Sequence, residues 1–295
     1  MRAILILSSV VFLLGSCIKN NPDPSWIEVN DWQLIANPDA QYPTGELTEN
    51  ITDAWVYVDN ELIGVFEVPF KIPVLLDGGR ELKIYPAVKN NGISATKKIY
   101  PFLEPFVTDV NLVMNEVVTV TPVTQYYKSI QFWIEDFEDA SFAIADGNGS
   151  LASLVRTSDA NVLNNNVNGA FFGRIALNET NNTYIGSTTA NNQGSLVMDL
   201  PRGQEVYLEI DYHTTSNLVT GVLAINSSGI ADNPMVQING QDASEVQWRK
   251  IYIDLREVVS GSTDADYFEF SFNAELESGV ASGEINIDNI KAVYF

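Results

Sequence analysis

The stretch Val-Tyr-Leu-Glu-Ile-Asp-Tyr-His at residues 206–213 decides the fold class of this chain. Its positions alternate between an apolar set (Val206, Leu208, Ile210, Tyr212) and a mixed aromatic and polar set (Tyr207, Glu209, Asp211, His213). Successive side chains of a β-strand point to opposite faces of a sheet, so a period of two residues indicates a strand with one buried face. We therefore predict that the first set lies in a core and that the second set points away from it.

The same period recurs along the rest of the chain. Residues 248–255 repeat it, with Trp248, Lys250, Tyr252 and Asp254 at the outward positions, and residues 267–274 place three phenylalanines at the inward ones. We find no amphipathic stretch longer than about two helical turns. The sequence therefore predicts an all-β protein.

The predicted strands form two blocks that follow a short, Pro-containing segment ending at residue 25. The first block covers residues 26–123, and Asn60 and Asn90-Asn91-Gly92 mark two of its turns. The second block covers residues 125–295 and has Asn- and Gly-rich loops between its strands. We therefore expect two domains, the second of them larger.

Each block resembles a known kind of domain. In residues 53–100 the order Val-Tyr-Val-Asp-Asn-Glu-Leu-Ile-Gly, then Pro, then Leu-Asp-Gly-Gly and Leu-Lys-Ile resembles PEGA-type surface domains. In the second block, Asp136-Phe137-Glu138 after the first strand and Ile287-Asp288-Asn289-Ile290 in the last resemble the jelly-roll modules of carbohydrate-binding domains. These resemblances imply an Ig-like β-sandwich followed by a larger jelly-roll β-sandwich.

The first 17 residues have the layout of a secretory signal. Arg2 is followed by an apolar run from Ala3 to Leu14. This run is too short to span a bilayer, which takes about 20 residues. Leu14-Gly15-Ser16-Cys17 resembles the bacterial lipobox. The resemblance implies that residues 1–16 are a removed signal peptide and that Cys17, the only cysteine, carries the acyl chains of a lipidated tether over residues 17–25.

Residue 18 is Ile rather than the Asp that favours retention at the inner membrane in the sorting rule of enterobacterial lipoproteins. By this resemblance we expect the protein at the outer membrane, anchored by lipid. The segment after Cys17 resembles the surface-export signal of Bacteroidetes lipoproteins only in Lys19. Whether the protein faces the periplasm or the cell surface therefore stays open.

The net charge and the cysteine content of the chain limit which partners and which cross-links it can have. The formal net charge is −22, so the chain should repel nucleic acid and anionic lipid surfaces. With Cys17 acylated, no thiol is left for a disulfide. The fold must be stabilised by its apolar core.

The outward positions of the second block are the candidate ligand contacts: Trp248, Tyr252, Tyr207, Asp211 and His213. Sugar rings stack on aromatic faces while polar groups bond their hydroxyls, so such a set on an open sheet suits a glycan. The alternative is a sheet face whose aromatic residues are covered by loops or by the other domain.

We predict a non-catalytic protein that binds a glycan or another envelope component. The alternative function is a structural or accessory subunit of an outer-membrane uptake, secretion or motility complex.

The sequence gives less support to the hypothesis that the protein is an enzyme. His213 is the only histidine, and no Gly-x-Ser-x-Gly motif occurs. Glu209-Ile210-Asp211 resembles the catalytic strand of laminarinase-type hydrolases, in which two carboxylates act as nucleophile and acid/base. The third acid of that strand is missing here, because His213 or Thr214 stands in its place. We therefore predict that the protein is not an enzyme.

A structural calcium ion is also implied by the jelly-roll resemblance. Modules of this kind often hold calcium between an acid near the first strand and an Asp of the last strand. The matching residues are Glu138 or Asp136 and Asp288. Calcium takes six to eight oxygen ligands, so backbone carbonyls would have to complete the shell.

Overall fold

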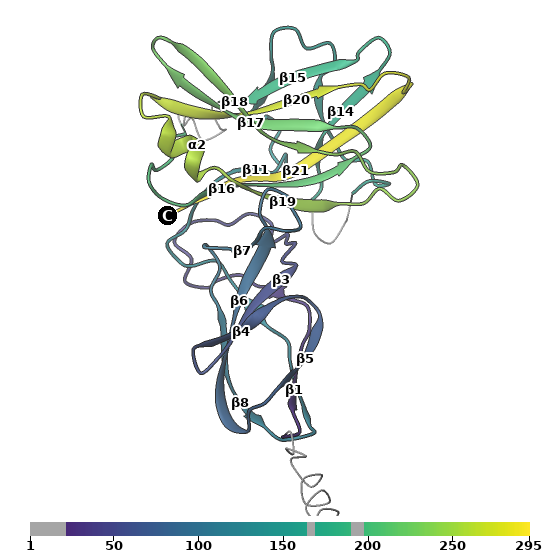
Figure 1. Cartoon of the computed structure of the whole chain (residues 1–295). Helices are drawn as coiled ribbons and strands as arrows, with labels where there is room; N and C mark the ends of the chain where they lie inside the picture. Colours follow the sequence, from purple (N-terminus) through teal and green to yellow (C-terminus); the bar gives the residue numbers. More distant parts are fainter. Residues whose placement is uncertain (1–21, 164–168, 190–197) are drawn as a thin grey trace, which may run out of the picture.

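The computed structural model describes residues 22–163, 169–189 and 198–295. Its strands form two bodies stacked one above the other in Figure 1, the first in purple and blue and the second in teal to yellow. The prediction of an all-β protein is confirmed, and α2 (Arg256–Gly261) is a short helix at one end of the second body. Within the described ranges, no helix has the length and apolar character needed to cross a membrane. Cys17 and the signal peptide lie outside these ranges.

The first body is built around β6, which pairs with β3 on one side and with β7 and β8 on the other, while β4 pairs with β3. A second sheet has the order β5-β1-β9, and β10 pairs with β2. The strands are β1 (Ser25–Val29), β2 (Gln33–Leu34), β3 (Asp53–Val58), β4 (Glu61–Glu67), β5 (Phe70–Val74), β6 (Gly78–Lys89), β7 (Lys97–Ile99), β8 (Phe106–Leu112), β9 (Val117–Val120) and β10 (Val123–Thr124).

The turns of the first body follow the predicted turn residues. Asp59 and Asn60 join β3 to β4 with φ angles of 48° and 66°. Asn91 and Gly92 lie between β6 and β7 with φ angles of 56° and 71°. Asn, Asp and Gly adopt this left-handed region most easily, which explains why these residues occupy tight hairpins.

The second body consists of two facing sheets. One has the order β13-β14-β21-β16-β19, with β11 also paired to β21, and the other has the order β12-β15-β20-β17-β18. The strands are β11 (Gln131–Glu135), β12 (Ile144–Asp146), β13 (Leu154–Thr157), β14 (Phe172–Asn178), β15 (Thr183–Thr188), β16 (Val206–Thr214), β17 (Leu218–Asn226), β18 (Gly229–Ile238), β19 (Arg249–Asp254), β20 (Tyr267–Glu275) and β21 (Ser282–Tyr294).

The core of the second body lies between these sheets and contains the predicted inward residues. Leu208 and Ile210 of β16 pack there with Ile253 of β19. Phe270 of β20 has no exposed surface and meets the Trp133 ring edge-on, with 6.0 Å between ring centroids. The period-two prediction of which side chains face inward is therefore confirmed.

The opposite face of the sheet that contains β16, β19 and β21 lies against the first body (Figure 1). Tyr207 and Tyr252 belong to the same buried apolar cluster as Tyr100 and Phe102 of the first body. The Tyr100 ring lies 5.2 Å from the Tyr207 ring and 4.9 Å from the Tyr252 ring. The two bodies thus share an apolar core across their junction.

Candidate functional site

The structure places three of the five predicted ligand contacts in the junction between the bodies. Tyr207 is 0% exposed, Tyr252 2% and Asp211 3%. Their predicted direction, away from the core of the second body, is confirmed. The expectation that they form an open ligand face is wrong, because the first body packs on them and excludes solvent. The alternative interpretation, an outward face covered by the other domain, describes these three residues.

Glu209 is the centre of a charged network within this junction. Its carboxylate accepts hydrogen bonds from the hydroxyls of Tyr100, at 2.5 Å, and Tyr126, at 2.8 Å. Lys250 lies 2.9 Å from the same carboxylate and 3.2 Å from that of Asp211. Burial alone would raise the pKa of Glu209, but Lys250, Lys291 and the Tyr100 hydroxyl hold this pKa below its ordinary value. Glu209 is therefore ionised and inaccessible to a substrate.

The lysines of this network also reach the first body directly. Lys250 donates to the Thr48 hydroxyl at 2.9 Å, and Lys291 donates to the backbone carbonyls of Thr44 and Glu46. Burial alone would lower the pKa of Lys250, but Asp211 and Glu209 raise it above its ordinary value. A buried charge is costly unless ion pairs or hydrogen bonds compensate it. Lys250 has two carboxylate partners, and Lys291 has the two backbone carbonyls. The network therefore specifies how the two bodies dock.

Trp248 and His213, the other two predicted contacts, lie beside the junction and are half-buried. The Trp248 indole N–H donates to the Val162 carbonyl at 2.6 Å, and its ring packs against Phe172 and His213 at 5.8 and 5.7 Å. Burial lowers the pKa of His213 below its ordinary value of 6.5, which favours the neutral ring. These two residues form part of a rim rather than of a flat open face.

Three adjoining hollows surround Arg249 at this rim, with volumes of about 300, 440 and 510 Å³. The first two share Tyr212 and Arg249, and the last two share Trp248 and Arg249. We call the three hollows together the junction groove. Glu49 and Asn50 of the first body line it on one side, so the groove exists only because the two bodies are docked.

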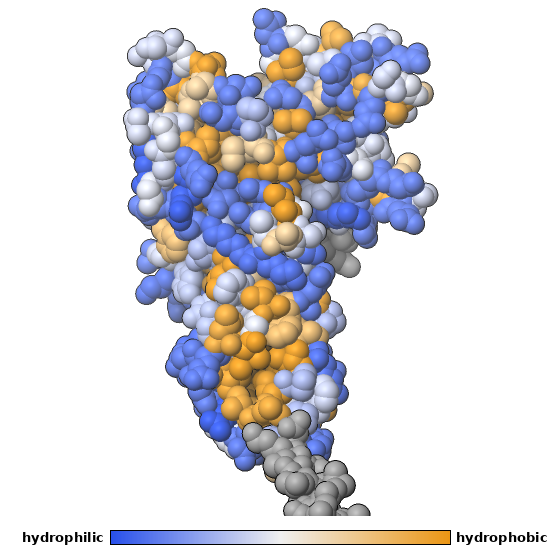
Figure 2. All heavy atoms as spheres, viewed as in Figure 1, coloured by the Kyte–Doolittle hydropathy of each residue, from blue (hydrophilic) through white to orange (hydrophobic). Residues whose placement is uncertain are grey.

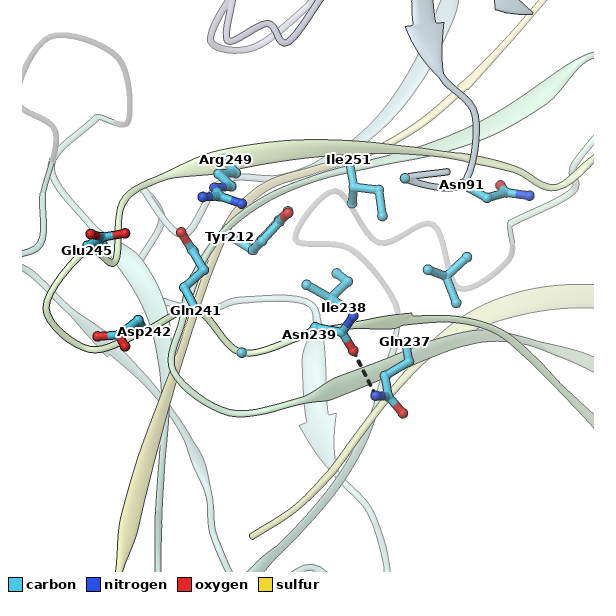
Figure 3. Close-up of a pocket in the computed structure, with 13 residues that line it drawn as sticks. Asn91, Tyr212, Gln237, Ile238, Asn239, Gln241, Asp242, Glu245, Arg249 and Ile251 are labelled. Carbon is cyan, nitrogen blue, oxygen red and sulfur yellow. Dashed lines mark hydrogen bonds between the residues drawn. The ribbon is translucent and has the colours of Figure 1, made fainter. Parts of the chain in front are cut away.

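Figure 3 shows the end of the junction groove that lies between β18 and β19. Arg249 points from β19 toward Tyr212, and the amides of Gln237 and Asn239 lie opposite, joined by a hydrogen bond of 2.9 Å. The acids Asp242 and Glu245 lie on the loop that joins β18 to β19 (Figure 3). One aromatic ring, several amides, two acids and a guanidinium therefore face one hollow, a composition suited to a polyhydroxylated ligand.

The loop that carries these polar residues is braced by its own side chains. Gln241 donates from its amide to the Gln247 carbonyl at 2.9 Å and accepts from the Gln247 N–H at 3.3 Å. A preformed loop loses less entropy when a ligand binds.

Sequence reasoning assigned Tyr212 to the core and did not identify Arg249 or this loop. The signal available was the polar run at residues 239–247 between two strands, where binding residues are often found.

The three predicted calcium ligands are not gathered into a metal site. Glu138 accepts hydrogen bonds from the Ala170 and Phe171 N–H groups, and Asp136 accepts one from the Glu138 N–H. Asp288 is fully buried, and its Oδ2 atom has no hydrogen-bond partner. Across the described ranges, no three His, Cys, Asp or Glu residues lie close enough together to hold a metal ion. The residues as placed do not form a calcium shell.

Asp288 itself gives a prediction for pH dependence. Burial, reinforced by the negative charges of Asp211, Asp136 and Glu138 and opposed by the Asn289 N–H, raises the pKa of Asp288 from 3.8 to about 9. Because the folded-state pKa is raised, this carboxyl favours folding most below pH ~4, and stability falls by about 1.4 kcal/mol per pH unit up to about pH 9. We expect Asp288→Asn to unfold at higher urea concentration than wild type at pH 8, and at the same concentration at pH 4.

Urea denaturation of both proteins in EDTA measures this difference. A variant whose midpoint differs from that of wild type by the same amount at both pH values would show that folding does not raise the pKa of Asp288. The same titration in calcium chloride tests the predicted calcium ion. A calcium-dependent rise in the wild-type midpoint that Asp288→Asn removes would support the ion, and no rise would exclude it from this carboxylate.

Comparison with known proteins gives structural likenesses only. No protein-family model matches the sequence, and no curated protein is similar to it. The chain is similar to the carbohydrate-binding module CBM27-1 of Caldicellulosiruptor saccharolyticus, with 15% identity, a TM-score of 0.37, and coverage of 55% of this chain and 97% of the module. It is also similar to the family 11 carbohydrate-binding module of Lic26A-Cel5E of Clostridium thermocellum, with 12% identity, a TM-score of 0.35, and coverage of 57% and 96%. At these values the likeness says nothing about the ligand of this chain.

Proposed function

We propose that this protein is a non-catalytic lipoprotein, anchored to the outer membrane through Cys17, that binds a glycan in the junction groove. One observation carries the proposal: Tyr212 and Trp248 flank Arg249 within one continuous groove whose lining also includes several amides and acids, together with apolar side chains. Aromatic faces bind the apolar faces of sugar rings, while amide and charged groups bond the hydroxyls.

The anchoring half of the proposal is supported by the lipobox-like residues 14–17. The described chain starts at Pro22, only five residues after Cys17. Several acyl chains, each contributing about 0.8 kcal/mol per buried methylene, hold a protein at a membrane surface. The junction between the two bodies lies at the opposite end of the first body from the start of β1 (Figure 1).

Calorimetric titration with a panel of neutral and acidic oligosaccharides tests the binding half. We expect Arg249→Ala to weaken binding at least about tenfold, because a hydrogen bond to a charged group contributes about 1.5–3 kcal/mol. Arg249 is exposed, so its replacement should leave the thermal unfolding temperature unchanged.

Arg256→Ala is the matched control for this experiment. Arg256 is also an exposed arginine of the second body, and its guanidinium binds Glu205 at 3.0 Å outside the groove. We expect the control variant to bind as wild type does. Equal affinities for Arg249→Ala, Arg256→Ala and wild type would remove the junction groove from the proposal.

A second candidate function is that of an accessory subunit of an outer-membrane complex. Figure 2 shows apolar residues gathered on one face of the first body. On β4, Leu62 is 50% exposed and Phe66 is half-buried, and the Phe66 ring stacks on that of the half-buried Phe70 at 4.8 Å. Both β4 and β5 are edge strands, and exposed edges often pair with other chains. This function predicts co-purification with a membrane barrel that Leu62→Lys abolishes and Arg249→Ala leaves intact.

A further inference from the structure

The end of the first body farthest from the second has four exposed apolar side chains. Leu75 is 68% exposed, Met114 53%, Val117 42% and Val113 38%. Strand pairing brings them together, because Val117 pairs with Trp26, Val74 pairs with Ser25, and Gly78 pairs with Leu112. We call these four residues the apolar tip. In Figure 1 they lie at the lower end, where β1 begins and β8 ends.

Residues 23–26, which lead into β1, are hydrogen-bonded to this same end of the first body. The Asn115 N–H donates to the Pro24 carbonyl at 2.9 Å, and the Asn115 side chain donates to Asp23 at 3.0 Å. The Trp26 N–H donates to the Glu116 carbonyl at 2.9 Å. These hydrogen bonds hold residues 23–26 beside the turn that contains Val113 and Met114. The five-residue step from Cys17 to Pro22 spans at most about 18 Å even when fully extended.

We propose that the apolar tip lies against the lipid bilayer, with its four side chains among the headgroups. This inference rests on the proposed acylation of Cys17, which would hold the tip within reach of the membrane. Exposed apolar groups next to a membrane gain free energy by leaving water. Beside the tip, Trp26 is half-buried and Lys71 lies over its ring at 5.7 Å. Tryptophan and lysine side chains of this kind are typical of a membrane interface.

The charges around the tip indicate which lipid surface it suits. Asp23, Asp77 and Glu116 adjoin the four apolar side chains, and Arg80 lies 4.0 Å from Asp77. Acidic residues are repelled by anionic lipids, so the contact is with a surface of zwitterionic lipids. Because the contact is apolar, it does not weaken as salt is added. The tip thereby orients the protein with the junction groove directed away from the membrane.

Site-specific fluorescence on the acylated protein, which begins at Cys17, in phosphatidylcholine vesicles tests this inference. Met114→Cys is labelled with an environment-sensitive dye, which is selective because acylation occupies Cys17. Lipids that carry a nitroxide at the headgroup are the quencher. Ile230→Cys is the matched control, because Ile230 is 64% exposed and lies in the second body. We expect a blue shift and quenching at residue 114, neither at residue 230, and no change between 0.05 and about 0.5 M salt.

The outcomes separate this inference from the function on which it rests. A protein that floats with the vesicles but is not quenched at residue 114 keeps its anchor and overturns the inference. A protein that does not float with the vesicles is not anchored through Cys17, which overturns this inference and the anchoring half of the proposed function but leaves glycan binding to its own test. A blue shift at residue 114 without vesicles, which grows with protein concentration, would assign the tip to a second copy of the chain and overturn the membrane contact.

Discussion

Lys250→Met should destabilise the protein by about 3–5 kcal/mol, the cost of removing one partner from a buried ion pair. Lys250 is 4% exposed, and its ammonium lies 2.9 Å from Glu209 and 3.2 Å from Asp211. Without it, two carboxylates stay in the junction with too little positive charge to compensate them. Urea denaturation followed by tryptophan fluorescence measures the loss.

Lys89→Met is the control for this prediction. Lys89 also pairs with a carboxylate, that of Glu67, but the side chains are 28% and 61% exposed. Surface pairs of this kind contribute about 0–1 kcal/mol. The triple variant Lys250→Met, Glu209→Gln, Asp211→Asn should recover part of the loss, because neither carboxylate is left without its lysine, and Lys291 keeps its hydrogen bonds to the Thr44 and Glu46 carbonyls. Equal midpoints for Lys250→Met and Lys89→Met would contradict the role assigned to the junction network.

Phe270→Ala should cost about 3–5 kcal/mol, as is typical of a large aromatic residue removed from a core. Phe270 has no exposed surface, and β20, which carries it, lies in the centre of its sheet between β15 and β17. The cavity left by the ring cannot close without moving both sheets of the second body, which pack closely. The loss should appear in the free energy of unfolding measured in urea.

Phe270→Leu tests whether volume is the cause. Leucine keeps most of the apolar volume, and such changes usually cost less than about 1.5 kcal/mol. We expect its unfolding midpoint between those of wild type and Phe270→Ala, and closer to wild type. If Phe270→Ala unfolds at the wild-type midpoint, the second body is not organised around the core described for it.

Much of the fold was predictable because it depends on local features of the sequence, namely the alternation of residues within strands and the residue types at turns. The alternation of residues 206–213 predicted the inward positions of β16, and Val206, Leu208 and Ile210 pack in the core as expected, while Tyr212 is only partly buried and also lines the junction groove. Asn60 and Gly92 were recognised as turn residues because few other residues adopt a positive φ easily. The pairing order of the strands was not predictable, since it depends on partners far apart in the chain, such as β11 and β21.

The site was predictable only in part. Trp248 was identified and lines the junction groove, but Tyr252, on the same strand face, is buried under the first body. Arg249 was missed because nothing in its own strand shows that three hollows meet beside it. The polar loop at residues 239–247 was the one local signal that pointed to this place.

By itself the sequence determined that the chain forms strands and which side chains leave the core of each sheet, because a strand's period is a local property. Only the tertiary structure decided what those outward side chains meet. Glu209 finds Tyr100 and Tyr126, which lie 109 and 83 residues away in the chain. The alternation of residue types along a strand shows to which face of the sheet a side chain points. It does not show which residue that side chain contacts. One sheet face could therefore be predicted as outward and still be buried by the docking of a second body.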